Sequence, residues 1–187
     1  MVRISEEFLS SRKKNNIFVE TGTNFGYTLE RALAVGYEKA LSIECNEQFY
    51  DMCRRKFDDD KRVGLYLGDS TTDLHLMIDG IDEPMDFWLD AHVVGGDPGI
   101  PADEYPSGGH VPILEELKQI LDHPNKDHLI IIDDIDLLSD PESGMGGEET
   151  TMDHLITFIK ERHANCFFEY DAGRRILFCD MSSIGDE

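Results

Sequence analysis

The chain has 187 residues, 40% of them hydrophobic, and its 39 acidic and 17 basic residues give a net charge of −22. The acidic residues are spread along the sequence, which excludes duplex nucleic acid and anionic membrane surfaces as expected partners, because both bind clustered cations. No apolar segment approaches the ~18 residues that a membrane span requires, and the first residues lack the apolar core of a signal peptide. We therefore expect a single cytoplasmic domain with reduced cysteines at Cys45, Cys53, Cys166 and Cys179.

The first half of the sequence alternates strand and helix patterns. Ser5 is placed to cap a short lead-in helix within residues 1–14, and three apolar residues at 17–19, followed by Glu20, favour a buried strand. Gly22 and Gly26 then allow a sharp turn into the next helix, whose free N–H groups would point at the same space as the turn. Strands are further expected at 39–44, 62–67 and 85–90, and helices at 27–35, 47–57 and 72–78.

The second half contains two segments that look like loops of a functional site. Residues 92–110 and 135–149 are rich in glycine and proline, and both are longer than routine connections. The apolar residues 129–132 show no alternation, which indicates a strand buried on both faces and near the centre of a parallel sheet. Helices are expected at 111–121 and 150–162, and a closing antiparallel hairpin at 166–170 and 175–179.

These elements predict a three-layer α/β fold with a mostly parallel seven-stranded sheet and an antiparallel hairpin at the end of the chain. Ligands of such folds bind at the carboxyl ends of the parallel strands. Acidic residues follow the expected strands at that edge of the sheet: Glu20, Glu44, Asp69, Asp90, Asp133 and Asp134.

The order and spacing of these residues resemble the class I S-adenosylmethionine-dependent methyltransferases. Residues 20–26 (ETGTNFG) resemble the glycine motif of that family, 42–44 (SIE) its acidic second strand, 68–70 (GDS) the end of its third strand, and 85–90 (MDFWLD) its fourth-strand motif. The resemblance covers about residues 15 to 180 and implies the Rossmann-like methyltransferase fold. It implies S-adenosylmethionine as the cofactor, bound by Glu20, Thr21, Gly22, Thr23, Gly26, Glu44, Cys45, Asp69, Ser70 and Asp90.

The residue types agree with that cofactor. Glu44 lies 18 residues after Gly26, about where a Rossmann-like unit presents a carboxylate to two ribose hydroxyls. Asp69 is an acceptor for the adenine amino group, and Glu20 attracts the ammonium of the methionine portion. An acidic pocket suits a sulfonium cation, whereas it would repel the pyrophosphate of a dinucleotide. Each acid also has a structural interpretation: Glu44 as a solvated strand end, and Asp69 as an Asx-turn residue.

A second group of acids suggests a metal site. Catechol O-methyltransferase-like and macrocin O-methyltransferase-like enzymes place a metal-binding aspartate after the fourth strand and an Asp-Asp or Asp-Asn pair after the fifth. Asp90, Asp133 and Asp134 match those positions. Neighbouring parallel strand ends are only ~5 Å apart, so the three carboxylates would repel one another unless protons or a cation neutralised them. Oxygen ligands favour Mg²⁺, and the alternative is that Asp133 or Asp134 caps a loop.

Two histidines flank the first long loop and are candidate catalytic bases beside Asp90. The neutral imidazole of His92 or His110 can accept a proton from a substrate hydroxyl near neutral pH. The alternative is that both are solvated loop residues.

The leading functional interpretation is therefore a methyltransferase that acts on a hydroxyl of a sugar or other small polar metabolite, with Mg²⁺ as a candidate assistant. One alternative is an NAD-dependent oxidoreductase, which shares the first strand–turn–helix unit and the ribose acid. Another is a module that binds the cofactor without transferring a methyl group. The sequence leaves the methyl acceptor and the oligomeric state open.

Overall fold

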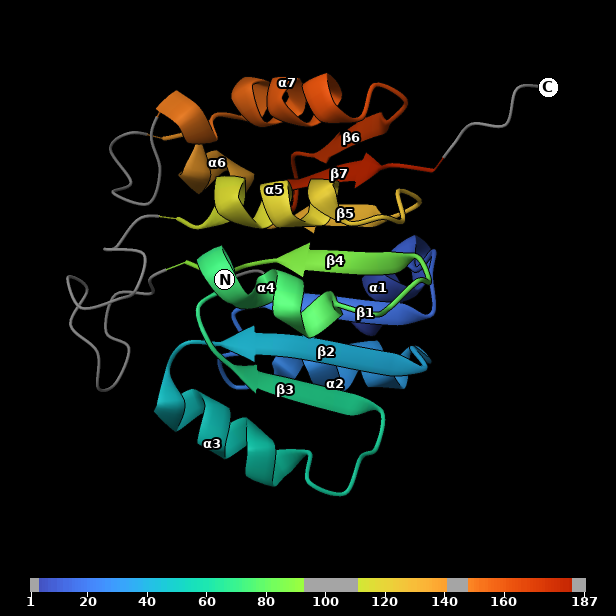
Figure 1. Ribbon diagram of the computed structural model, residues 1–187, viewed down its shortest axis with the longest axis vertical. Helices are drawn as coiled ribbons and strands as arrows, with labels where there is room; N and C mark the ends of the chain where they lie inside the picture. The colour runs from blue at the N-terminus through green and yellow to red at the C-terminus, as the bar shows by residue number, and fades with distance from the viewer. Residues whose placement is uncertain (1–3, 93–110, 141–147, 183–187) are drawn as a thin grey trace.

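The described residues form a seven-stranded sheet in the order β3-β2-β1-β4-β5-β7-β6 (Figure 1). The computed structural model describes residues 4–92, 111–140 and 148–182. The strands are β1 Ile17–Thr21, β2 Lys39–Glu44, β3 Val63–Leu67, β4 Met85–Leu89, β5 Leu129–Ile132, β6 Phe167–Asp171 and β7 Ile176–Asp180. The first five are parallel, and β7 pairs antiparallel with both β5 and β6.

Helices cover both faces of this sheet, so the fold has three layers. They are α1 Glu6–Arg12, α2 Tyr27–Ala34, α3 Glu47–Lys56, α4 Ser70–Ile78, α5 Ile113–Asp122, α6 Ile135–Leu138 and α7 Met152–Arg162, with a 3₁₀ turn at Glu148–Thr150. In Figure 1, α4 and α5 cross in front of the sheet and α1 and α2 lie behind it. Among the described residues, no helix is long and apolar enough to cross a bilayer.

Successive side chains of each strand point to opposite faces of the sheet, so the protein has a separate hydrophobic core on each face. Val19, Phe87 and Ile130 are register partners or neighbours on one face and pack with α4, α5 and α7. On the other face, Phe18 and Trp88 pack with α1, α2 and α3. Because both faces of the central strands are covered, every residue of β1, β4 and β5 is buried, as expected of internal strands in an α/β protein.

Most expected elements are confirmed within a few residues, and the differences have local causes. Asp69 accepts a hydrogen bond from the Thr71 N–H, so α4 starts at Ser70, two residues before the expected start. The loop expected at 135–149 contains α6, a single turn whose Ile135 and Leu138 are buried. The 129–132 strand is internal, but β4 occupies the middle of the sheet.

A buried carboxylate fixes the start of the sheet. Asp86 on β4 is fully buried and accepts hydrogen bonds from the backbone N–H of Lys14 (2.8 Å), the backbone and side chain of Asn15, and the Tyr37 hydroxyl (2.8 Å). Burial raises the pKa of Asp86, and these hydrogen bonds oppose that change. The side chain therefore ties the segment between α1 and β1 to β4.

We expect Asp86→Ala to lower the free energy of unfolding by about 3 kcal/mol or more, because several buried donors lose their acceptor at once. Urea denaturation followed by circular dichroism measures the change. Asp86→Asn is the matched variant: it keeps one acceptor oxygen and should lose less. An unchanged denaturation midpoint in Asp86→Ala would show that this clamp does not stabilise the fold.

Candidate functional site

The turn between β1 and α2, residues 21–26, is closed tightly against the end of β4; we refer to it as the cofactor turn. The Gly22 N–H donates to the Ile43 carbonyl (3.0 Å), and Gly22 has a φ of +81°. A Cβ atom there would lie 2.9 Å from the Asp90 carbonyl oxygen. At Gly26, with a φ of +70°, a Cβ atom would lie 2.7 Å from the Phe57 ring. Both positions therefore require glycine.

Glu44 holds the cofactor turn from β2. One carboxylate oxygen accepts the Asn24 N–H (2.8 Å), and the other accepts the Asn46 N–H (2.8 Å). Glu44 is buried, and Asn24 has the uncommon positive φ of 48° that this contact fixes. A carboxylate oxygen can accept more than one hydrogen bond, which is the property that a ribose-binding acid needs.

Glu20 is connected to the cofactor turn through two hydroxyl groups, those of Ser42 and Thr23. The Ser42 hydroxyl donates to the Glu20 carboxylate (2.8 Å), and the Thr23 hydroxyl is 2.6 Å from Ser42 Oγ. Burial raises the pKa of Glu20 well above its usual range, and the negative charges of Asp90 and Glu44 add to that shift. A cation bound beside Glu20 would reverse this effect.

The predicted adenosine-binding residues lie after β2 and β3. Cys45 is half-buried and directly follows Glu44. Asp69 caps α4 through the Thr71 N–H (2.9 Å), as in the Asx-turn interpretation, and its second carboxylate oxygen is a further acceptor. Ser70 is buried in the first turn of α4.

Asp90, His92 and Asp134 form an acid–imidazole cluster next to the cofactor turn. Their ligand atoms lie within 4.8 Å of one another. His92 Nε2 is 3.2 Å from an Asp90 oxygen and 3.6 Å from an Asp134 oxygen. Burial alone would lower the pKa of His92, but the two carboxylates outweigh it and raise that pKa to about 10.

Asp133 is not part of the cluster, although the sequence groups it with Asp90 and Asp134. Its carboxylate accepts the Asp134 N–H (2.8 Å), as in the loop-capping interpretation. Burial and the charge of Asp90 raise the pKa of Asp133 to about 7. His110 lies outside the described residues, as do 93–110 and 141–147, so the two expected loops are described only in part.

Sequence reasoning missed Arg175 and Glu116. Arg175 precedes β7 and forms an ion pair with Asp134, and its carbonyl accepts the Ile135 N–H (2.9 Å). Asp134 and Arg175 have φ values of +50° and +61°, so two strained residues meet at the cluster. Glu116 is buried on α5, and the hydroxyl groups of Thr21 and Ser70 act on its pKa. The sequence contained one signal for each residue. Arg175 begins an expected strand, and Glu116 is a charged residue at a helix position that faces inward.

The comparisons with known proteins agree on the fold. No protein-family model matches the sequence, and no curated protein is similar to it. The S-adenosylhomocysteine-bound methyltransferase PaMTH1 from Podospora anserina is 13% identical, with a TM-score of 0.60 over 95% of this chain and 76% of that one. The O-methyltransferase TomG from Streptomyces achromogenes, involved in tomaymycin synthesis and solved with S-adenosylmethionine, is 12% identical, with a TM-score of 0.58 over 95% and 78%.

A Streptococcus mutans protein in complex with S-adenosylhomocysteine is 16% identical, with a TM-score of 0.59 over 97% of this chain and 100% of that one. The strand order and the antiparallel β7 agree with the fold class that the sequence predicts. The chain therefore has the Rossmann-like fold of the class I S-adenosylmethionine-dependent methyltransferases.

Proposed function

We propose that the protein is an S-adenosylmethionine-dependent methyltransferase that methylates a hydroxyl group of a small polar molecule such as a sugar. The observation that carries this proposal is the close approach of Gly22 to Asp90. A Cβ atom added at Gly22 would lie only 2.9 Å from the Asp90 carbonyl oxygen. The cofactor turn and the acid–imidazole cluster are therefore adjacent, as a group donor and its acceptor must be.

The residues around the cofactor turn fit this cofactor. Glu44 offers carboxylate oxygens for ribose hydroxyls, and the absence of side chains at Gly22 and Gly26 lets the cofactor turn pack tightly against Asp90 and Phe57. Glu20 is buried and forms no ion pair among the described residues, so the positive methionine portion would stabilise its ionised form. When bound, S-adenosylmethionine supplies the methyl group from its sulfonium. Three neighbours of similar fold were solved with this cofactor or its product.

We propose that the methyl acceptor binds at the acid–imidazole cluster. Asp90 and Asp134 orient His92 through Nε2, and the other ring nitrogen, Nδ1, is buried without a hydrogen-bond partner in the described structure. A buried, unpartnered imidazole nitrogen is a ready partner for a hydroxyl. In its neutral form, His92 would hold the acceptor oxygen and take its proton at Nδ1, and the carboxylates would stabilise the resulting imidazolium.

The charge balance of the cluster favours transfer without a metal. Asp90 and Asp134 carry two negative charges, and His92 and Arg175 carry two positive charges when protonated. The Mg²⁺ hypothesis called for oxygen ligands only, whereas the grouped side chains of the described residues are an imidazole and two carboxylates, one of them paired with an arginine. A divalent ion would have to displace these cations. We therefore propose the metal-free form, with Mg²⁺ as the alternative outcome.

Transfer of a labelled methyl group to a panel of sugars and other hydroxyl compounds tests the proposal. We expect incorporation that persists in excess EDTA and in Asp133→Asn. Loss of incorporation under EDTA, restored by Mg²⁺, would assign a metal to the cluster. Label on no hydroxyl compound, with tight cofactor binding, would instead indicate a module that binds the cofactor without transferring a methyl group.

A further inference from the structure

Arg175 lies at the acid–imidazole cluster in a backbone conformation that an arginine rarely adopts. Its φ is +61°, in the left-handed region where glycine, asparagine and aspartate are the usual residues. A sequence chosen for the fold alone would place a glycine here. Because non-glycine residues with such a backbone cluster at functional sites, the arginine side chain itself needs an explanation.

The ion pair with Asp134 accounts for only part of this side chain. One Nη atom of Arg175 donates to Asp134, which is the only ion-pair or hydrogen-bond partner of the guanidinium among the described residues. A guanidinium carries five N–H donors, and the Arg175 side chain is 32% exposed. An ion pair this exposed contributes less stability than the strained backbone costs. Stability of the fold therefore does not explain Arg175, and several of its donors can still bind a ligand.

The position of this guanidinium relates it to the proposed base. Asp134 Oδ1 pairs with Arg175, and Asp134 Oδ2 lies 3.6 Å from His92 Nε2. The guanidinium and the imidazole therefore contact the two oxygens of one carboxylate. Because β7 pairs antiparallel with β5, the start of β7 lies beside the end of β5, at the edge of the sheet that carries the cluster. Arg175 is thus a cation next to the place where the acceptor hydroxyl would bind.

The neighbouring arginine has a different environment. Arg174 Nη1 is 2.9 Å from an Asp171 oxygen, and its guanidinium lies 4.7 Å from the centre of the Phe8 ring on α1. Phe8 belongs to the core on the face of the sheet that α1, α2 and α3 cover. Of these two adjacent arginines, Arg175 is the one that contacts the cluster, and Arg174 provides a matched control.

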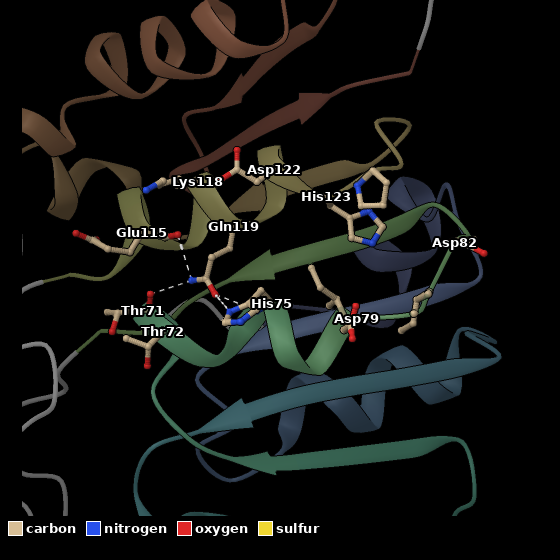
Figure 2. A pocket seen from close by; sticks show the side chains of 14 residues that line it. Thr71, Thr72, His75, Asp79, Asp82, Glu115, Lys118, Gln119, Asp122 and His123 are labelled. Carbon is tan, nitrogen blue, oxygen red and sulfur yellow. Dashed lines mark hydrogen bonds between the residues drawn. The ribbon is translucent and has the colours of Figure 1, made fainter.

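A pocket between α4 and α5 is the alternative place for a small ligand. Its volume is about 510 Å³, which is within the range of small-molecule sites. Figure 2 shows that Lys118 is joined there by four acids, Asp79, Asp82, Glu115 and Asp122. This lining repels an anion, and it includes no described residue of the cofactor turn or of the cluster. An anionic acceptor is therefore expected at Arg175 and not in this pocket.

We propose that Arg175 binds an acid group of the methyl acceptor, so that the substrate is a small hydroxyl compound with a carboxylate or a phosphate, such as a sugar acid or a sugar phosphate. This inference rests on the proposed function. Arginine binds both kinds of acid group through paired N–H donors. The carboxylates of Asp90 and Asp134 repel an anion placed at His92. The acid group therefore lies on the guanidinium side, and the hydroxyl lies at the imidazole.

Transfer of a labelled methyl group to matched pairs of compounds tests this inference. Each pair consists of a neutral hydroxyl compound and its acid form, for example glucose with glucuronate and glucose with glucose 6-phosphate. The measured quantity is the preference ratio, which is kcat/KM for the acid member divided by kcat/KM for the neutral member. We expect wild type to prefer the acid member of a pair at least tenfold, and the preferred member identifies the acid group as a carboxylate or a phosphate.

Arg175→Gly removes the guanidinium without straining the backbone. Glycine suits the φ of +61°, and the backbone carbonyl that accepts the Ile135 N–H remains. The preference ratio should fall about ten- to a hundredfold, as expected for lost hydrogen bonds to a charged group. A disturbed Asp134 would slow transfer to both members of a pair and leave the ratio unchanged.

Two further variants complete the test. Arg175→Lys keeps the positive charge without the paired donors, so its preference ratio should fall between those of Arg175→Gly and wild type. Arg174→Gln should keep the wild-type ratio. Wild type that prefers the neutral members, or a ratio that Arg175→Gly leaves in place, would overturn the inference and leave the proposed function intact. Transfer to no member of any pair, with S-adenosylhomocysteine bound, would overturn both.

Discussion

Glu44→Ala should weaken the binding of S-adenosylhomocysteine by about ten- to a hundredfold, which corresponds to about 1.5–3 kcal/mol. The variant loses two interactions at once. The ribose hydroxyls lose their charged acceptor, and the N–H groups of Asn24 and Asn46 lose the carboxylate that shapes the cofactor turn. Isothermal titration calorimetry at neutral pH measures the change.

Two further variants separate the two effects. Glu44→Gln keeps one acceptor oxygen and should fall between alanine and wild type. Glu38→Ala removes an exposed acid that directly precedes the first residue of β2. This variant should bind S-adenosylhomocysteine as wild type does, and it controls for the general loss of negative charge. Equal affinity in wild type and Glu44→Ala would show that Glu44 does not bind the cofactor.

The second large effect is expected at His92. His92→Ala should lower turnover by about 10²- to 10⁴-fold, the usual contribution of a general base, and leave the affinity for S-adenosylhomocysteine within about threefold. His154→Ala is the matched control, since His154 is exposed on α7, far along the chain from the cluster. A parallel fall in affinity and turnover would assign His92 to cofactor binding instead.

The pH dependence of turnover provides an independent check of the same role. The carboxylates of Asp90 and Asp134 hold the pKa of His92 at about 10 in the described structure, so the imidazole is protonated at neutral pH. The imidazole must lose this proton before it can act as the base. Turnover should therefore rise as the pH increases through the alkaline range. Asp134→Asn removes one carboxylate and should move this rise to lower pH. A profile that is flat from neutral to alkaline pH would contradict the assignment.

The fold could be predicted because its signals are local. Apolar segments, the glycines of the cofactor turn and the acids after each strand lie within a few residues of one another, and the parallel topology brings them to one edge of the sheet. Glu44 shows the limit of such signals: its position was predictable, but its role as the acceptor for Asn24 and Asn46 depends on the folded turn.

Contacts between distant segments could not be predicted in the same way. Arg175 meets Asp134 only because β7 inserts antiparallel beside β5, a pairing that the hairpin pattern alone does not specify. Glu116 is buried only through the packing of α5 on the sheet, and its inward position on the helix indicates burial without specifying its neighbours. Asp133 and Asp134 are adjacent acids, and only the backbone geometry at Asp134 separates their environments.

Calorimetry of the wild-type protein with S-adenosylhomocysteine and, separately, with NAD tests the central claim most directly. The buried acids Glu20 and Glu44 favour a cofactor whose methionine portion is cationic and disfavour a pyrophosphate. We predict saturable, one-to-one binding of S-adenosylhomocysteine and no detectable heat with NAD. Binding of NAD without binding of S-adenosylhomocysteine would contradict the account and assign the cofactor turn to a dinucleotide.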